Sequence, residues 1–210
     1  MGEAKSHCIA CVGSRSVPAV SDRDYLTSIG AFYVEQGFTL TTGNAPGADQ
    51  LFALGGSTVD PTKVELYLPW QSFEHHAIIE GNKVFHAGQA LEKHVELARD
   101  GSPGFDYGMR GTVKPLFIRN AMILYRFGEK VDLVLAWPNF HQHGWGGTGT
   151  RCGWLPRLTF QSFCSTDGAT GISSTACARS AGRADSIGSS RSSNAVYFTI
   201  IIDERSSLKV

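Results

Sequence analysis

The sequence has no apolar run of the roughly 18 residues that a membrane-spanning helix needs, and its first residues do not resemble a secretory signal peptide. Its 19 lysines and arginines are balanced by 19 aspartates and glutamates, so it lacks the net positive charge of a general nucleic-acid-binding protein, although a local basic patch is compatible with this balance. Its five cysteines, an odd number without a regular spacing, argue against a disulfide-bonded secreted domain. We therefore expect a cytoplasmic protein without membrane contacts.

Enough apolar residues are present for a folded core, since they make up 42% of the 210 residues. The chain divides in composition near residue 150. Residues 1–150 contain 12 basic residues, 15 acidic residues and 8 serines, whereas residues 151–210 contain 7, 4 and 12. Periodic patterns are confined to the first part, apart from a strand expected at 195–202. We predict one domain at 1–150 and an irregular tail rich in serine, glycine and arginine at 151–210.

Residues 1–150 alternate between short apolar runs and segments of helical periodicity. Strands are expected at 7–12, 38–42, 64–68 and 131–137. Helices are expected at 21–36, with Ser21 and Asp24 as a capping box, at 46–55, at 73–99 and at 113–127. This alternation predicts an α/β fold of three layers, with a mostly parallel sheet and helices on both faces. Right-handed crossovers would place every loop that follows a strand at one edge of that sheet.

Three glycine-rich loops follow predicted strands, at residues 13–15, 43–49 and 146–149. Ligands of open α/β sheets bind beyond the carboxyl ends of the strands. Glycines let the backbone approach a ligand, and a helix that begins in such a loop favours phosphate. Arg15 would add a charge-assisted contact, and Asp49 would either cap its helix or accept a hydrogen bond from a ribose hydroxyl. The three loops together predict a phosphate or nucleotide site.

Three stretches resemble the Rossmann-like domain of the DNA-processing protein DprA, whose pattern runs roughly VGSR, then SGGARGID, then an RN pair. They are residues 12–15, residues 42–49, and residues 117–120 with Arg119 and Asn120. The wider group is the SLOG superfamily, and residues 146–150 are similar to the GGxGT stretch of its LOG-type phosphoribohydrolases. The resemblance covers about residues 7–150.

The resemblance implies a nucleotide or nucleic-acid phosphate as ligand. Together with the loop pattern, it gives these candidate binding residues: Gly13, Ser14, Arg15, Gly43, Asn44, Gly47, Ala48, Asp49, Arg119, Asn120, Gly146, Gly147, Thr148 and Gly149. Arg15 and Arg119 would pair with phosphate oxygens, and the glycine loops would donate backbone N–H groups. Asp49 and Asn120 would orient a sugar or base, or brace the loops.

The function expected is phosphate binding by a DprA-like protein in DNA processing or recombination, with a nucleotide or single-stranded DNA as partner. One alternative is a LOG-like N-glycosidase acting on nucleoside monophosphates, although Gly153 stands where the LOG pattern has its catalytic glutamate. Another is a sensor in which a nucleotide changes the state of a homo-oligomer. No catalytic residue is assigned, since nothing selects among Glu74, Glu80 and Asp106 as acid or base.

No metal or cofactor is expected. Cys8 and Cys11 are spaced as in a metal-binding pair, but residues three apart on a strand face opposite sides. His75 and His76, like the histidines at 141 and 143, have no partners at ligand spacing. The aromatic residues near the third glycine loop would stack on a base or pack in the core.

The segment that follows Gly149 has neither helical nor strand periodicity, although a helix and then a strand would complete the sheet. Reading the codons of residues 150–165 one base earlier allows a sequence such as GGTGHTMRVA…NIPVFLL, which is a helix followed by a buried strand. One hypothesis is therefore that the segment from residue 150 onward is translated out of frame. The alternative is a natural tail of low order.

Overall fold

The computed structural model describes residues 7–102, 104–109, 111–127 and 129–137, together with the backbone of two strands at 159–165 and 196–202. The strands are β1 (Cys8–Gly13), β2 (Thr39–Thr42), β3 (Val64–Leu68), β4 (Lys83–His86), β5 (Leu133–Trp137), β6 (Thr159–Ser165) and β7 (Val196–Ile202). The α-helices are α1 (Val20–Glu35), α2 (Ala48–Val59), α3 (Glu92–Asp100) and α4 (Lys114–Leu124). Short 3-10 helices lie at Pro61–Lys63, His75–Ala77 and Ala87–Gln89.

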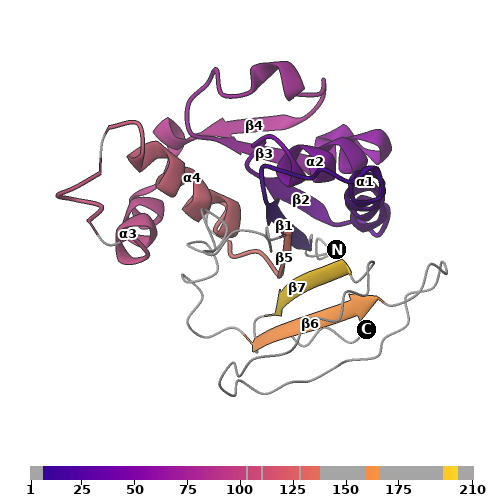
Figure 1. The fold of residues 1–210 in the computed structure, drawn as a ribbon. Helices are drawn as coiled ribbons and strands as arrows, with labels where there is room; N and C mark the ends of the chain where they lie inside the picture. Colours follow the sequence, from indigo (N-terminus) through magenta and orange to yellow (C-terminus); the bar gives the residue numbers. More distant parts are fainter. Residues whose placement is uncertain are drawn as a thin grey trace, which may run out of the picture.

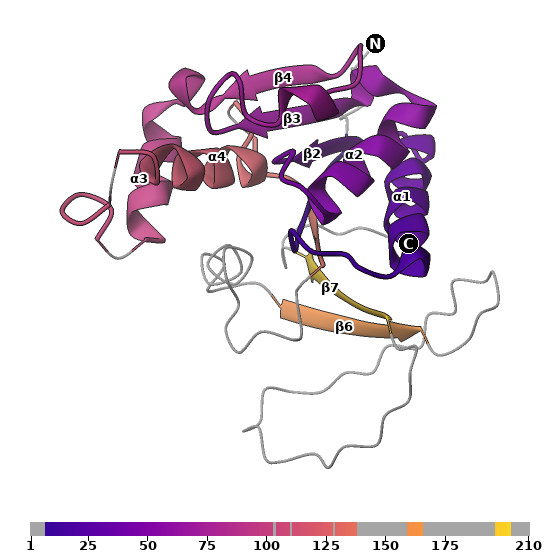
Figure 2. The same ribbon diagram turned by 45° about the horizontal axis from the view of Figure 1, so that its top comes forward.

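The strands form one sheet in the order β4-β3-β2-β1-β5-β7-β6 (Figure 1). The first five are parallel to one another, whereas β7 runs antiparallel to β5 and β6 antiparallel to β7. Helices α1 and α2 cover one face of the parallel part, and α4 with α3 outside it lies on the other (Figure 2). This is a Rossmann-like α/β fold of three layers, as the alternating pattern predicted.

The alternation of side chains along β1 builds a core on each face of the sheet. Ile9 and Cys11 belong to the apolar cluster under α1 and α2, whereas Cys8, Ala10 and Val12 belong to the cluster under α4. All five side chains are buried. Because both faces are covered, the strand is a continuous apolar run rather than an alternating one.

The order of the strands reverses beside β1. The chain passes from β1 through α1 to β2, and through α2 to β3, always moving away from β5. It then returns past α4 on the other face to place β5 against β1, with Gly13 beside Trp137. In open α/β sheets this reversal marks the edge where ligands bind.

One predicted helix, at 73–99, is wrong over most of its length, because the segment contains β4. Gly81 turns the chain with a φ of 93°, and β4 then pairs with the free edge of β3. Phe85 stacks on its neighbour Tyr67 with ring centroids 5.2 Å apart. The pairing of β4 with β3 therefore determines the structure of this segment, in spite of its predicted helical pattern.

The ends of two other predicted helices also differ. Helix α1 begins at Val20 with Ala19 as its N-cap and no side-chain cap, so Ser21 lies inside the first turn instead of capping the helix. Helix α2 begins after Gly47 and continues past Gly55 to Val59. A Cβ at Gly55 would overlap the Thr27 carbonyl of α1, so this glycine permits close helix packing rather than ending the helix.

Two strands occur in the tail that was predicted to be irregular. Strand β7 confirms the strand expected at 195–202, and it adds to the sheet beside β5. Strand β6 was not predicted. The other residues from 138 onward lie outside the described part of the chain. Among the described residues, no helix has the length and apolar character needed to cross a membrane.

A buried charged cluster lies under the α4 face. The Arg126 guanidinium donates to both carboxylate oxygens of Glu65, at 2.8 and 2.6 Å, and the Tyr67 hydroxyl donates to the same carboxylate at 3.0 Å. The hydrogen bond to Glu65 raises the pKa of Arg126, and burial, with the nearby Glu65 charge, raises the pKa of Tyr67. Arg126 therefore binds Glu65 in a bidentate, charge-assisted arrangement.

Candidate functional site

The loops that follow β1 and β2 lie in backbone contact at the carboxyl edge of the sheet. The Ser14 N–H donates to the Trp137 carbonyl at 2.7 Å, and the Ser14 carbonyl accepts from the Ala48 N–H at 2.9 Å. Ser14 therefore joins the end of β5 to the first turn of α2. The first two glycine loops are thus neighbours at the point where the strand order reverses.

Gly47 allows this close approach. Its φ is 91°, and a Cβ at this position would lie 2.5 Å from the Ser14 carbonyl oxygen and 2.6 Å from the Arg15 carbonyl carbon. A side chain would therefore be strained by its backbone conformation and would also push the two loops apart. Arg15, on the other side of this contact, is exposed to solvent.

Asp49 is buried where β1 and α2 meet, with 1% of its surface exposed. Its Oδ1 accepts a hydrogen bond from the Gly13 N–H at 2.9 Å, and its Oδ2 lies 3.5 Å from the Arg119 Nη1. The carboxylate thus joins the end of β1 to α2 and lies beside the guanidinium of α4.

Arg119 is enclosed at the same edge, with 1% of its surface exposed. A Cβ at Gly43 would overlap its guanidinium, and the ring of Phe73 lies 5.9 Å from its Cζ. The absence of a side chain at Gly43 therefore makes the room that Arg119 occupies. The cation lies under the second loop, beside Asp49, whereas Arg15 faces solvent.

Several buried polar atoms near the end of β2 have no hydrogen-bond partner among the described residues. They are Thr42 Oγ1, Asn44 Oδ1 and Asn120 Oδ1. Helix α4 lies directly against this strand, since the Thr41 hydroxyl donates to the Ile123 carbonyl at 3.0 Å. Buried polar groups are ordinarily paired, so unpaired ones mark a place where water or a ligand is bound.

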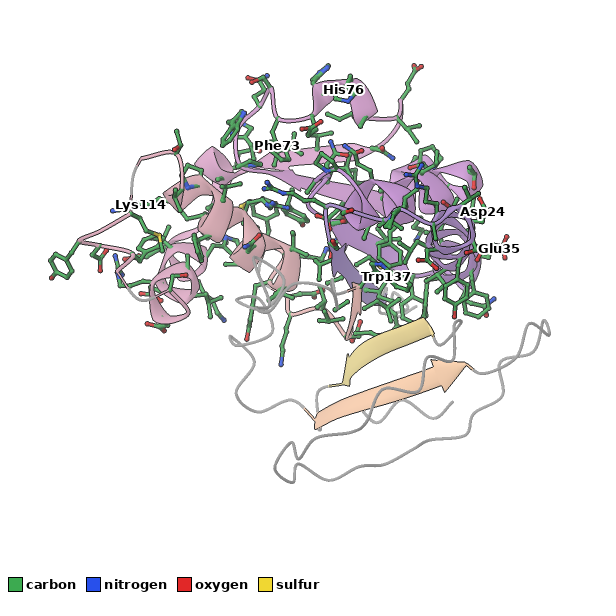
Figure 3. The ribbon with its side chains drawn as sticks, viewed as in Figure 1. Asp24, Glu35, Phe73, His76, Lys114 and Trp137 are labelled. Carbon is green, nitrogen blue, oxygen red and sulfur yellow. The ribbon has the colours of Figure 1, made fainter. Side chains whose placement is uncertain are left out.

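The loop that follows β3 contributes residues that the sequence did not indicate as site residues. The Asn44 side chain donates to the Glu74 carbonyl at 3.1 Å, and both residues have left-handed backbones, with φ of 52° and 46°. Phe73 contacts Arg119, and Figure 3 shows it closer to the sheet than His76, which projects outward. The expectation of a helix at 73–99 left this loop out of the predicted site.

The sequence-predicted residues are thus placed as follows. Those brought together at the carboxyl edge are Gly13, Ser14, Arg15, Gly43, Asn44, Gly47, Ala48, Asp49, Arg119 and Asn120. Those that lie outside the described residues are Gly146, Gly147, Thr148 and Gly149. Among the possible acids and bases, Asp106 pairs with Arg99 at 2.9 Å on the surface, and Glu80 is exposed.

Cys8 and Cys11 are buried free thiols in the clusters on opposite faces of the sheet. Burial raises the pKa of Cys8 to about 12 and also raises the pKa of Cys11. They cannot bind one metal ion together. Within the described ranges, no group of three or more His, Cys, Asp or Glu side chains is placed to hold a metal.

Comparisons with known proteins do not assign the chain to a family. No family model matches the sequence, and no curated protein and no solved structure matches the chain. The function must therefore be inferred from the fold and from the residues at its carboxyl edge.

Proposed function

We propose that this chain binds the phosphate of a nucleotide or of a nucleic acid, in a DprA-like role in DNA processing or recombination. The observation that carries the proposal is the contact between the loops after β1 and β2. Gly47 packs on the backbone of Ser14 and Arg15, at the reversal of strand order and at the start of α2. Glycine loops at such helix starts are typical phosphate sites.

The two arginines have different roles in this proposal. Arg15 is exposed beside Gly47 and can pair directly with phosphate oxygens. Arg119 is buried against Asp49 and holds the second loop in position from below. Asp49 accepts the Gly13 N–H and thereby fixes the first loop. The site thus consists of one exposed cation and two loops braced by a buried ion pair.

The experiment compares the full chain with Arg15→Ala by calorimetry, using AMP, ADP and inorganic phosphate as ligands. Fluorescence anisotropy with a labelled oligo(dT) tests DNA. We expect Arg15→Ala to weaken phosphate-bearing ligands about tenfold, the effect of losing one charge-assisted hydrogen bond. Lys83→Ala is the matched control, since Lys83 is an exposed cation at the amino end of β4. It should leave binding unchanged.

The outcomes separate the classes of function. Binding of oligo(dT) that AMP displaces supports the DNA-processing role, and binding of mononucleotides alone supports a nucleotide site without DNA. Release of free adenine from AMP in the same samples would instead show the N-glycosidase. Light scattering with and without AMP tests the sensor. Failure of every ligand to bind the folded chain would overturn the proposal.

A further inference from the structure

Asn44 is a buried amide at the end of β2 whose orientation is fixed. The residue has no exposed surface, and its Nδ2 donates to the Glu74 carbonyl. A carbonyl oxygen only accepts hydrogen bonds, so the amide nitrogen must face Glu74 and the amide oxygen must lie on the other side. The left-handed backbone at Asn44 positions the side chain between Gly43 and the loop that follows β3.

The Asn44 Oδ1 has no hydrogen-bond partner among the described residues, and the same holds for Oγ1 of the fully buried Thr42. Leaving a buried acceptor unpaired is costly, which calls for a partner other than the described residues. An ionised phosphate offers oxygen acceptors and no reliable donor, so it cannot satisfy an amide oxygen. The missing partner is therefore an O–H or N–H group.

We propose that Asn44 determines specificity by accepting a hydrogen bond from an O–H or N–H group on the non-phosphate part of the ligand. The ligand class is then a nucleoside phosphate, recognised by a sugar hydroxyl or by a base amine as well as by its phosphate. The proposal rests on the phosphate site proposed above. Because Oδ1 is enclosed, a ligand group reaches it through a local movement that keeps the hydrogen bond between Asn44 and Glu74.

Two variants distinguish the loss of the acceptor oxygen of Asn44 from the loss of its hydrogen bond to the Glu74 carbonyl. Asn44→Gly suits the φ of 52° and removes both side-chain functions. Asn44→Asp keeps an acceptor oxygen but loses the donor to Glu74, and aspartate tolerates the left-handed backbone. Asn82→Gly is the control, because Asn82 also binds backbone and side-chain partners through its amide but precedes β4 at the opposite edge.

The experiment measures the dissociation constants of AMP, its 2′-deoxy and 3′-deoxy analogues, purine ribonucleoside monophosphate, which lacks the exocyclic amine, and inorganic phosphate. We expect the wild type to bind AMP about tenfold or more tightly than one of these analogues. In Asn44→Gly the ratio of the two dissociation constants should fall to about twofold or less. In Asn44→Asp and Asn82→Gly the ratio should stay near that of the wild type. Circular dichroism confirms that each variant is folded.

Each outcome decides the proposal. Loss of the preference over a deoxy analogue identifies a sugar hydroxyl as the donor, and loss of the preference over the purine analogue identifies the amine. A wild type that binds phosphate and all four nucleotides equally, or an Asn44→Gly variant that keeps the preference, would overturn this inference while leaving the phosphate site standing. If the wild type binds neither phosphate nor any nucleotide, both proposals fail.

Discussion

Asp49 and Arg119 form a buried ion pair between helices on opposite faces of the sheet, with Asp49 Oδ2 3.5 Å from Arg119 Nη1. Asp49 belongs to α2 and Arg119 to α4, so the pair joins the two outer layers beyond the carboxyl ends of the strands. Both side chains are at most 2% exposed. The pair therefore fixes the loops that follow β1 and β2 relative to each other.

Breaking this pair should be costly. Asp49→Asn or Arg119→Met leaves one buried charge without its partner, and each should lower the free energy of unfolding by about 3 kcal/mol. The double variant removes both charges, so it should lose clearly less than the sum of the two. Urea unfolding of the wild type and the three variants measures this coupling. Additive losses would mean that the two charges do not interact.

The requirement for glycine at position 47 can be tested against a second glycine with a positive φ. Gly37 has nearly the same φ, 86° against 91°, but a Cβ there meets nothing within 4 Å. Gly37→Ala should therefore cost about 1 kcal/mol, the penalty of the left-handed backbone. Gly47→Ala should cost about 2 kcal/mol more, because its Cβ strikes the Ser14 carbonyl and because its ψ of −128° lies outside the left-handed region that alanine tolerates. Equal losses in urea unfolding would show that the loops can separate freely.

How much of this the sequence predicts depends on the range of the interaction. The strands at β1, β2, β3 and β5 were predicted to within two residues, because each is an apolar run bounded by turn residues. The contact of Asp49 with Arg119 was not predictable, since it depends on how two helices meet across the sheet. Glu74 was noted only as a possible acid or base. Its connection to Asn44 arises because the segment pairs as β4 instead of forming a helix.

A second ion pair, in which only the carboxylate is buried, allows a comparison with an exposed pair. The side chains of Arg126 and Glu65 are 24% and 4% exposed, whereas Arg99 and Asp106 form a surface pair with exposures of 49% and 40%. Arg126→Met should lower the free energy of unfolding by about 3 kcal/mol, because Glu65 stays buried without its partner. Arg99→Met should cost less than about 1 kcal/mol. Similar losses for the two variants would mean that solvent reaches Glu65.

The buried thiols should be unreactive in the folded protein. Burial raises the pKa of Cys8 to about 12 from an ordinary value of 9.0, so almost no thiolate forms near neutral pH. We expect N-ethylmaleimide at about pH 8 to modify Cys8 and Cys11 only after unfolding in urea, as measured by mass spectrometry of the digested chain. Rapid labelling of either cysteine in the folded chain would contradict the buried positions.

The raised thiol pKa should also make the stability of the protein depend on pH. Because the folded state holds these protons more tightly than the unfolded state, the free energy of unfolding should decrease as the pH rises above about 9.

The origin of residues 150–210 is decided by the gene. In the structure β5, the last of the five parallel strands, pairs with β7, which runs antiparallel and is not preceded by a described crossover helix. Right-handed crossovers would instead bring a parallel strand next to β5, and the codons read one base earlier from residue 150 allow a helix and an apolar strand. We expect sequencing of the source gene to show a one-base change near codon 150. We also expect a chain with the restored frame to have a higher melting temperature than the present one, because a helix and a parallel strand would complete the α/β layers beside β5. An uninterrupted frame that encodes the tail, together with no gain in melting temperature, would show that the tail is native to the protein.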